Sequence, residues 1–218
     1  MNIEKTIVNT FKPLENNSFL SPIDLDATIE QCSREQRIRL SLFAEANVSY
    51  ILMMCDYYDE YYIPISSLAE KIGIKVFTDE MGDNGTSALY MFESERKIIL
   101  LNSKDSIARQ RLTTACILGM YLFEYSHSKD RVVDLFRLDE RMLYNREMSI
   151  KDYYYLMFAV YLLIPDEKFR AILDKMKKVM NGDEIRRLLP VLTKKYGVPR
   201  EAMDLRLELM LLGDKHGN

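Results

Sequence analysis

The hydrophobic pattern first predicts a long amphipathic helix from about Glu35 to Tyr58. Its apolar positions recur at roughly helical spacing: Ile38, Leu42, Ala46, Ile51, Met54 and Cys55. Residues 63–77 then predict a short helix that ends at Gly73 and runs into a strand. Residues 87–92 and 97–102 predict two further strands joined by a polar turn.

Two strongly apolar runs, residues 115–123 and 156–164, predict buried helices that begin near Asp105 and Asp152. Ser103 or Asp105 is the expected cap of the first, which extends to about Glu124. Both runs fall short of the ~20 residues that a membrane-spanning helix needs. The charged segment between them, residues 126–152, is predicted to be partly helical around residues 132–141. Residues 183–213 predict a helix, a turn and a second helix.

Residues 1–34 form an N-terminal extension, in which Ser21 to Asp24 predict a helix start. The first residues show no apolar run of signal-peptide length, and the three cysteines lack CxxC spacing, so we expect a cytoplasmic protein with reduced, buried thiols. The net charge of −3 gives no overall electrostatic reason to expect nucleic acid or an anionic membrane as the main partner.

The run RLTTACILGMYLFEY, residues 111–125, resembles the zinc helix of the ImmA/IrrE metallopeptidases, R-[FL]-T-x-A-H-E-x-G-H-[YF]-L. The matching positions are Arg111, Leu112, Thr113, Ala115, Gly119, Tyr121 and Leu122. Residues 152–165, DYYYLMFAVYLLIP, resemble the family's third-ligand helix, E-x-E-A-N-x-F-A-A-x-L-L-M-P. Aligning the two on Pro165 places Tyr154 at the ligand glutamate.

The resemblance spans roughly residues 36–213 and implies an α+β, predominantly helical fold. Its zincin-like core would hold a small, mostly antiparallel β-sheet packed against a buried helix. The implied organisation is an N-terminal extension (1–34), a peptidase-like domain (35–182) and a C-terminal helix-turn-helix-like subdomain packed on the core (183–218).

The residues that would perform peptidase chemistry are replaced. In HExxH, two histidines four residues apart bind zinc and the glutamate takes a proton from the metal-bound water. Cys116 and Met120 stand at the histidine positions and Ile117 at the glutamate, while the chain's only histidines are His127 and His216. The sequence therefore predicts no catalytic residue, no zinc and no other cofactor.

Two interpretations stay open for the residues at these positions. Cys116 and Met120 could form a soft-metal site, although plain core packing is the simpler reading. The candidate binding-cleft residues are Cys116, Met120, Tyr153, Tyr154 and His127, because tyrosine combines contact area with a polar tip.

Three functions compete. The first is an inactive, regulatory relative of the bacterial ImmA/IrrE peptidases that binds a protein, such as the helix-turn-helix repressors that family members cleave in stress responses and mobile elements. The second is a hydrolase with a relocated, non-standard metal site, with Glu124, His127, Glu140 and Glu147 as candidates. The third is a DNA-binding regulator acting through the tail. The acidic residues of the last helix, Glu201, Asp204 and Glu208, disfavour the third.

Overall fold

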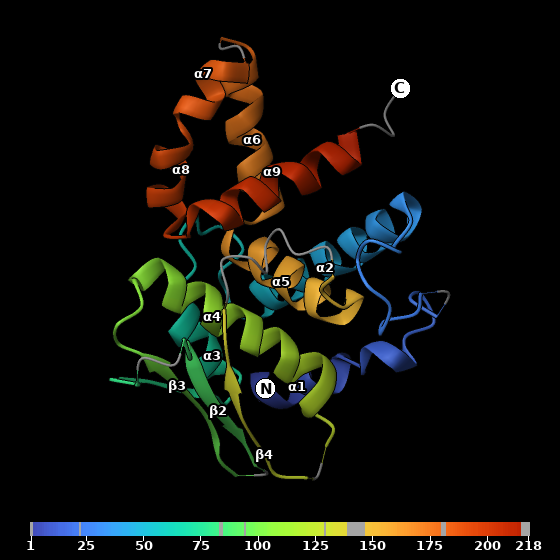
Figure 1. The fold of residues 1–218 in the computed structure, drawn as a ribbon, viewed down its shortest axis with the longest axis vertical. Helices are drawn as coiled ribbons and strands as arrows, with labels where there is room; N and C mark the ends of the chain where they lie inside the picture. The colour runs from blue at the N-terminus through green and yellow to red at the C-terminus, as the bar shows by residue number, and fades with distance from the viewer. Residues whose placement is uncertain are drawn as a thin grey trace.

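The computed structural model describes residues 2–21, 23–82, 85–93, 95–128, 130–138, 147–179 and 182–214 (Figure 1). In chain order the elements are α1 (Ile3–Thr10), η1 (Leu14–Asn16), α2 (Arg34–Met54), α3 (Ile65–Lys71), β1 (Lys75–Asp79), β2 (Ala88–Phe92), β3 (Lys97–Asn102), α4 (Ile107–Met120), η2 (Tyr121–Tyr125), β4 (Val132–Phe136), α5 (Ile150–Leu163), α6 (Asp166–Lys177), α7 (Gly182–Arg187), α8 (Leu189–Tyr196) and α9 (Arg200–Asp214).

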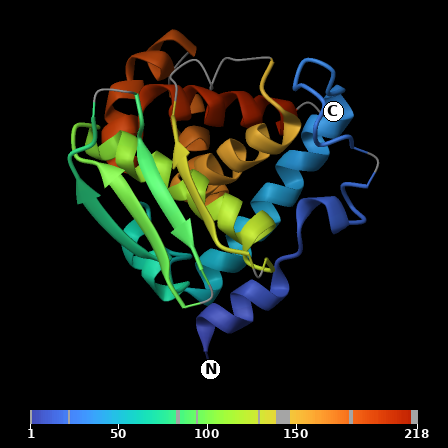
Figure 2. The same cartoon turned by 60° about the horizontal axis from the view of Figure 1, so that its bottom comes forward.

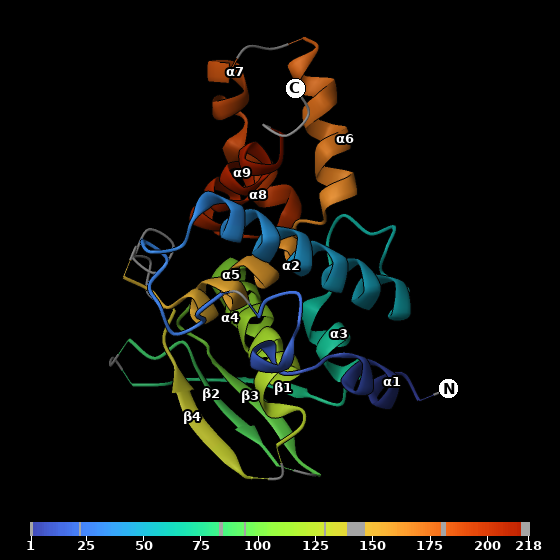
Figure 3. The same ribbon diagram turned by 90° about the vertical axis from the view of Figure 1, so that its right-hand side faces the viewer.

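The strands form one sheet in the order β1-β3-β2-β4. β1 is parallel to β3, and the other two pairings are antiparallel. Side chains alternate across the sheet, so that Tyr90 and Phe92 of β2 and Ile99 and Leu101 of β3 are buried on one face. The helices lie on that face only, as the turned views show (Figures 2 and 3).

Helix α4 occupies the middle of the molecule, between the sheet and α5 (Figure 1). Every residue from Gln110 to Gly119 is buried. Helix α5 is buried from Tyr153 to Leu163, and α2 packs against it on the side away from α4 (Figure 3). The predicted α+β fold, mainly helical with a small and mostly antiparallel sheet, is confirmed. Among the described helices, none is both long and apolar enough to cross a membrane.

Most predicted elements are present. The first predicted helix of the tail is divided into α7 and α8 at Leu188, and three other predictions differ from the structure. The segment predicted as helical from residue 132 is instead the edge strand β4, because Val132–Phe136 pairs with β2; residues 139–141 of that prediction lie outside the described residues. Ser21 and Ile23 lie in turns rather than at a helix start, and Pro22 is not described. The cap of α4 is Ser106, whose hydroxyl accepts from the Arg109 amide, rather than Ser103 or Asp105.

The N-terminal extension forms backbone hydrogen bonds with the start of α5. The amide of Ile29 donates to the Met148 carbonyl, and the amide of Ile150 donates to the Ala27 carbonyl, at 2.9 and 2.8 Å. The isolated bridge between Thr28 and Ser149 lies between these bonds. Residues 25–29 therefore form part of the folded body, although the predicted boundary at residue 34 stays a prediction.

The turn between α8 and α9 is held against α4 by Arg111, which is 6% exposed. Its Nε donates to the Gly197 carbonyl at 2.9 Å and its Nη2 to the Tyr196 carbonyl at 3.3 Å. The guanidinium carbon lies 3.8 Å from the ring centroid of Tyr62. Gly197 ends α8 at a φ of +62°, where a Cβ atom would come within 2.5 Å of Tyr62. One arginine thus joins the central helix to the C-terminal pair.

A second buried arginine, Arg206 of α9, joins this helix to the end of α5. Its side chain is fully buried, its Nε donates to the Ile164 carbonyl at 3.0 Å, and its guanidinium forms an ion pair with Asp166. The guanidinium also lies 4.3 Å from the ring centroid of Tyr161. Burial by itself would raise the pKa of Asp166, but the positive charges of Arg206 and Arg170 outweigh it and lower that pKa below its usual value.

Candidate functional site

The centre of the candidate site is the contact between α4 and α5. Gly119 of α4 lies so close to α5 that a Cβ atom there would stand 2.9 Å from Cδ1 of Phe158. Phe158 is itself fully buried and meets Phe123 edge-on at 5.5 Å. The small residue in α4 therefore sets how closely the two helices approach.

Cys116 and Met120 lie on one face of α4 and line the same pocket, as their four-residue spacing predicts. The pocket has a volume of about 200 Å³ and lies between α4, α5 and β4. Cys116 is only 2% exposed, and burial raises the pKa of its thiol well above the usual value. Burial therefore favours the protonated thiol over the thiolate, which is the nucleophilic form.

Helix α5 contributes Asp152, Tyr155 and Leu156 to the pocket, one face of its first turns. Tyr154 lies elsewhere: it is fully buried, and its ring meets Phe123 at 5.2 Å and Phe43 at 5.6 Å. Its hydroxyl accepts a hydrogen bond from Asn47 of α2 at 3.4 Å. Of the five predicted cleft residues, Cys116 and Met120 are therefore brought together, and Tyr154 packs into the core.

The other two predicted cleft residues also lie outside this pocket. Tyr153 is 9% exposed. Its pKa is raised mainly by burial and also by the negative charge of Glu208. His127 lies after η2, where its Nε2 forms a hydrogen bond with the carbonyl of Phe11 in the N-terminal extension. Neither side chain lines the space beside Cys116 and Met120.

Polar residues outside the five predicted cleft residues also line the pocket. They are Tyr90, Asp134, Arg137, Asp152 and Tyr155. Asp134 became visible only through the strand β4, in which it alternates with Val133 and Leu135. Asp152 also closes the N-terminal cap of α5, since its carboxylate accepts from the Ser149 hydroxyl at 2.8 Å.

Glu124 is engaged beside the pocket rather than free to act as a base. Its carboxylate pairs with Lys151 at 2.7 Å and accepts from the Tyr155 hydroxyl at 3.0 Å. Burial alone would lower the pKa of Lys151, but the bond to Glu124 raises it, so the ion pair persists at neutral pH. Glu147 is exposed, and Glu140 lies outside the described residues.

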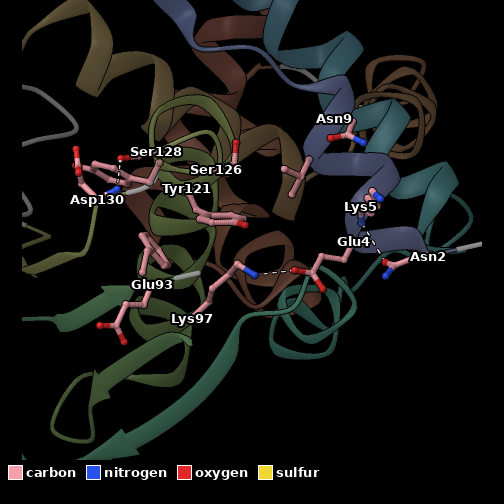
Figure 4. A pocket seen from close by; sticks show the side chains of 13 residues that line it. Asn2, Glu4, Lys5, Asn9, Glu93, Lys97, Tyr121, Ser126, Ser128 and Asp130 are labelled. Atoms are coloured by element: carbon pink, nitrogen blue, oxygen red, sulfur yellow. Dashed lines mark hydrogen bonds and ion pairs between the residues drawn. The ribbon is translucent and has the colours of Figure 1, made fainter. Parts of the chain in front are cut away.

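A second pocket, of about 300 Å³, separates α1 from η2 and the strands (Figure 4). None of the five predicted cleft residues lines this pocket. Glu4 of α1 points across it to Lys97 of β3, with 2.7 Å between Oε1 and Nζ, while the backbone amide of Lys5 donates to Oδ1 of Asn2 (Figure 4). The Glu4–Lys97 ion pair crosses this pocket and helps to hold α1 against the sheet.

A buried helix between a small sheet and a second buried helix, with the first helix opening onto a cleft, is the arrangement of zincin-like peptidase domains. The family model of the IrrE N-terminal-like domain, peptidase family M78, matches residues 69–208. The chain belongs to this family. No curated protein matches the chain.

The donor atoms at the family's zinc position do not suit zinc. A thiol kept protonated by burial and a thioether replace two imidazoles, and a thioether favours softer ions. Tyr154 cannot complete the set, since its hydroxyl lies against Asn47. In the part of the chain that the structure describes, no three His, Cys, Asp or Glu side chains are grouped to hold a metal.

Proposed function

We propose that this protein is a catalytically inactive relative of the IrrE-type peptidases that acts as a protein-binding regulatory module. The observation that carries the proposal is the pocket between α4, α5 and β4, which is lined in part by Cys116 and Met120, the residues at the family's histidine positions. It is a cleft with an apolar floor and exposed charged residues at its edge, and its lining residues include no histidine.

Loss of the general base supports inactivity. Ile117 stands where the family has its glutamate, is fully buried, and has no atom that accepts a proton. Glu124 is the nearest carboxylate along α4 and η2, and its ion pair with Lys151 and bond from Tyr155 occupy it. No water-activating group therefore remains on the helix that carries this chemistry in the family.

The pocket wall formed by β4 supports protein binding. β4 is the edge strand of the sheet, so its outer backbone groups can pair with an extended segment of a partner. Asp134 and Arg137 on the rim offer charged contacts, and Met120 and Leu156 offer an apolar floor. In the wider family, helix-turn-helix repressors are the proteins cleaved, and a repressor is the partner class we propose, regulated by occupancy instead of cleavage.

DNA binding through the C-terminal helices receives less support. Arg206 is fully buried against Asp166 and cannot reach a phosphate. Arg200 lies 3.7 Å from Asp204 on the surface of α9. The helix that would enter a groove thus offers few free positive charges.

Zinc content tests inactivity. Elemental analysis of the purified protein is expected to find far less than one zinc per chain. Mass spectrometry of repressors incubated with the protein is expected to find no cleavage products. One tightly bound zinc per chain, lost in Cys116→Ala, would overturn the proposal.

Binding is tested separately by calorimetry with the helix-turn-helix repressor encoded nearest to this protein. Asp134→Arg, at an exposed rim position, should weaken binding, whereas Val191→Arg, at a 61% exposed position on α8, should not. Equal affinity of both variants and the unaltered protein would argue against the pocket as the binding site.

A further inference from the structure

The face of the sheet turned away from the helices is apolar across all four strands. Strand pairing sets its side chains in two rows. The first row is Phe77, Leu100, Leu89 and Leu135, and the second is Lys75, Ile98, Met91 and Val133. Seven of the eight residues are apolar, and Lys75 is the one charge.

This face is open to solvent. Phe77, Val133 and Leu135 are 50%, 48% and 47% exposed, and the four apolar residues on the two inner strands are partly exposed. None of the described helices covers it (Figures 2 and 3). Stable monomers rarely leave so continuous an apolar surface in water, so a partner is expected to cover it.

We propose that the partner is a second copy of this chain, packed sheet against sheet about a two-fold axis. The axis would run between the two rows, across the strands, and would place each row over the other row of the second copy. Leu100 then faces Ile98 of the second copy, Leu89 faces Met91, and Leu135 faces Val133. Two antiparallel-aligned sheets pack in this way at a spacing of about 10 Å.

The single charge in the rows fits the same symmetry. The operation that pairs the apolar residues places the Lys75 ammonium over the Phe77 ring of the second copy, and the reverse. An ammonium over an aromatic face is attractive, particularly when partly desolvated. The two lysines do not oppose each other, and no acid lies in either row. The surface is thus complementary to itself, which an isologous two-fold interface requires.

The helix side of the molecule is unaffected by this arrangement. Asp134 and Phe136 of β4 alternate with Val133 and Leu135, whose side chains extend from the other face of the strand, and Leu135 contributes to the pocket lining at the edge of the sheet. A dimer formed through the open face therefore presents two pockets, each still accessible from its own helix side.

Sedimentation velocity on the full chain tests the proposal. A species of twice the 25.6 kDa chain mass should appear as the protein concentration rises through the micromolar range. Phe77→Asp and Leu135→Lys should each weaken the dimer by roughly a hundredfold, because they place a charge in an apolar interface. Leu42→Lys and Val191→Lys, at 55% and 61% exposed sites on helices, should leave dimerisation unchanged.

Disulfide trapping tests the register. The native cysteines, Cys32, Cys55 and Cys116, are all buried and do not compete. A mixture of Leu89→Cys and Met91→Cys proteins should cross-link in higher yield than either variant alone, since the axis pairs these two positions. A monomer at every concentration would overturn the proposal, as would a dimer that the two sheet variants leave intact.

Discussion

Replacing Arg111 by alanine should detach the C-terminal helix pair from the core. The substitution removes two charge-assisted hydrogen bonds, to the carbonyls of Gly197 and Tyr196, and the contact with the Tyr62 ring. Each bond from a charged group contributes about 1.5–3 kcal/mol, and the carbonyls left behind are largely sealed from water. We expect Arg111→Ala to reduce the free energy of unfolding by about 3–5 kcal/mol.

Urea denaturation followed by circular dichroism measures this loss, and amide hydrogen exchange locates it. Exchange should accelerate at Tyr196 and Val198 and along α9 before it changes in the sheet. The free energy of unfolding of Arg111→Lys should lie between those of the unaltered protein and Arg111→Ala, because an ammonium can bond to one carbonyl but cannot stack flat on Tyr62. Arg200→Ala is the matched control in the same unit, because its ion pair with Asp204 is exposed and should contribute less than about 1 kcal/mol. Equal losses for Arg111→Ala and Arg200→Ala would refute the reasoning.

Two further predictions concern buried groups. The three thiols should resist a disulfide reagent at pH 8 until urea unfolds the chain, because burial raises the pKa of Cys32 and of Cys116, and that of Cys55 to about 11. Rapid labelling of Cys116 in the native protein would contradict this prediction. Asp166→Asn should cost about 3–5 kcal/mol by leaving the buried Arg206 charge uncompensated. Because the folded pKa of Asp166 is lowered, its contribution to the free energy of unfolding is complete above the unfolded pKa near 4 and is lost as pH falls through the folded pKa. The free energies of unfolding of the unaltered protein and the variant, measured in urea, should therefore converge in acid. A difference between the two that stays constant with pH would contradict this.

The sequence pattern was informative where an element's local signals agree with its neighbours. The long helix α2 begins at a capping box of Ser33 and Gln36, and α3 ends two residues before Gly73, whose φ is +84°. The strands β2 and β3 are short apolar runs on either side of a polar turn, and α4 and α5 stand out through their longer apolar runs. Each of these signals lies within a few residues in the chain, so that no distant contact was needed to interpret it.

Prediction failed where pairing or facing depends on distant residues. Val132–Phe136 lies among charges and becomes a strand because β2 offers it a partner, which the local pattern does not reveal. Helix α5 is buried on nearly every side, so its sequence does not show which face lines the pocket. The alignment with the family favoured Tyr154, whereas the packing directs Asp152, Tyr155 and Leu156 there.

Helix α4 does not simply stop at Met120 but widens into the π-helical turn η2, in which the Ser126 amide bonds to the Tyr121 carbonyl five residues back at 2.7 Å. Such a turn contains one residue more than a regular helix of the same course, and it rotates everything that follows. The widened turn presents Tyr121 and Tyr125 together to Phe92, at 4.9 and 5.8 Å between ring centroids. Because the widened turn begins only after Met120, the extra residue leaves the buried stretch of α4 before it in regular helical register against α5.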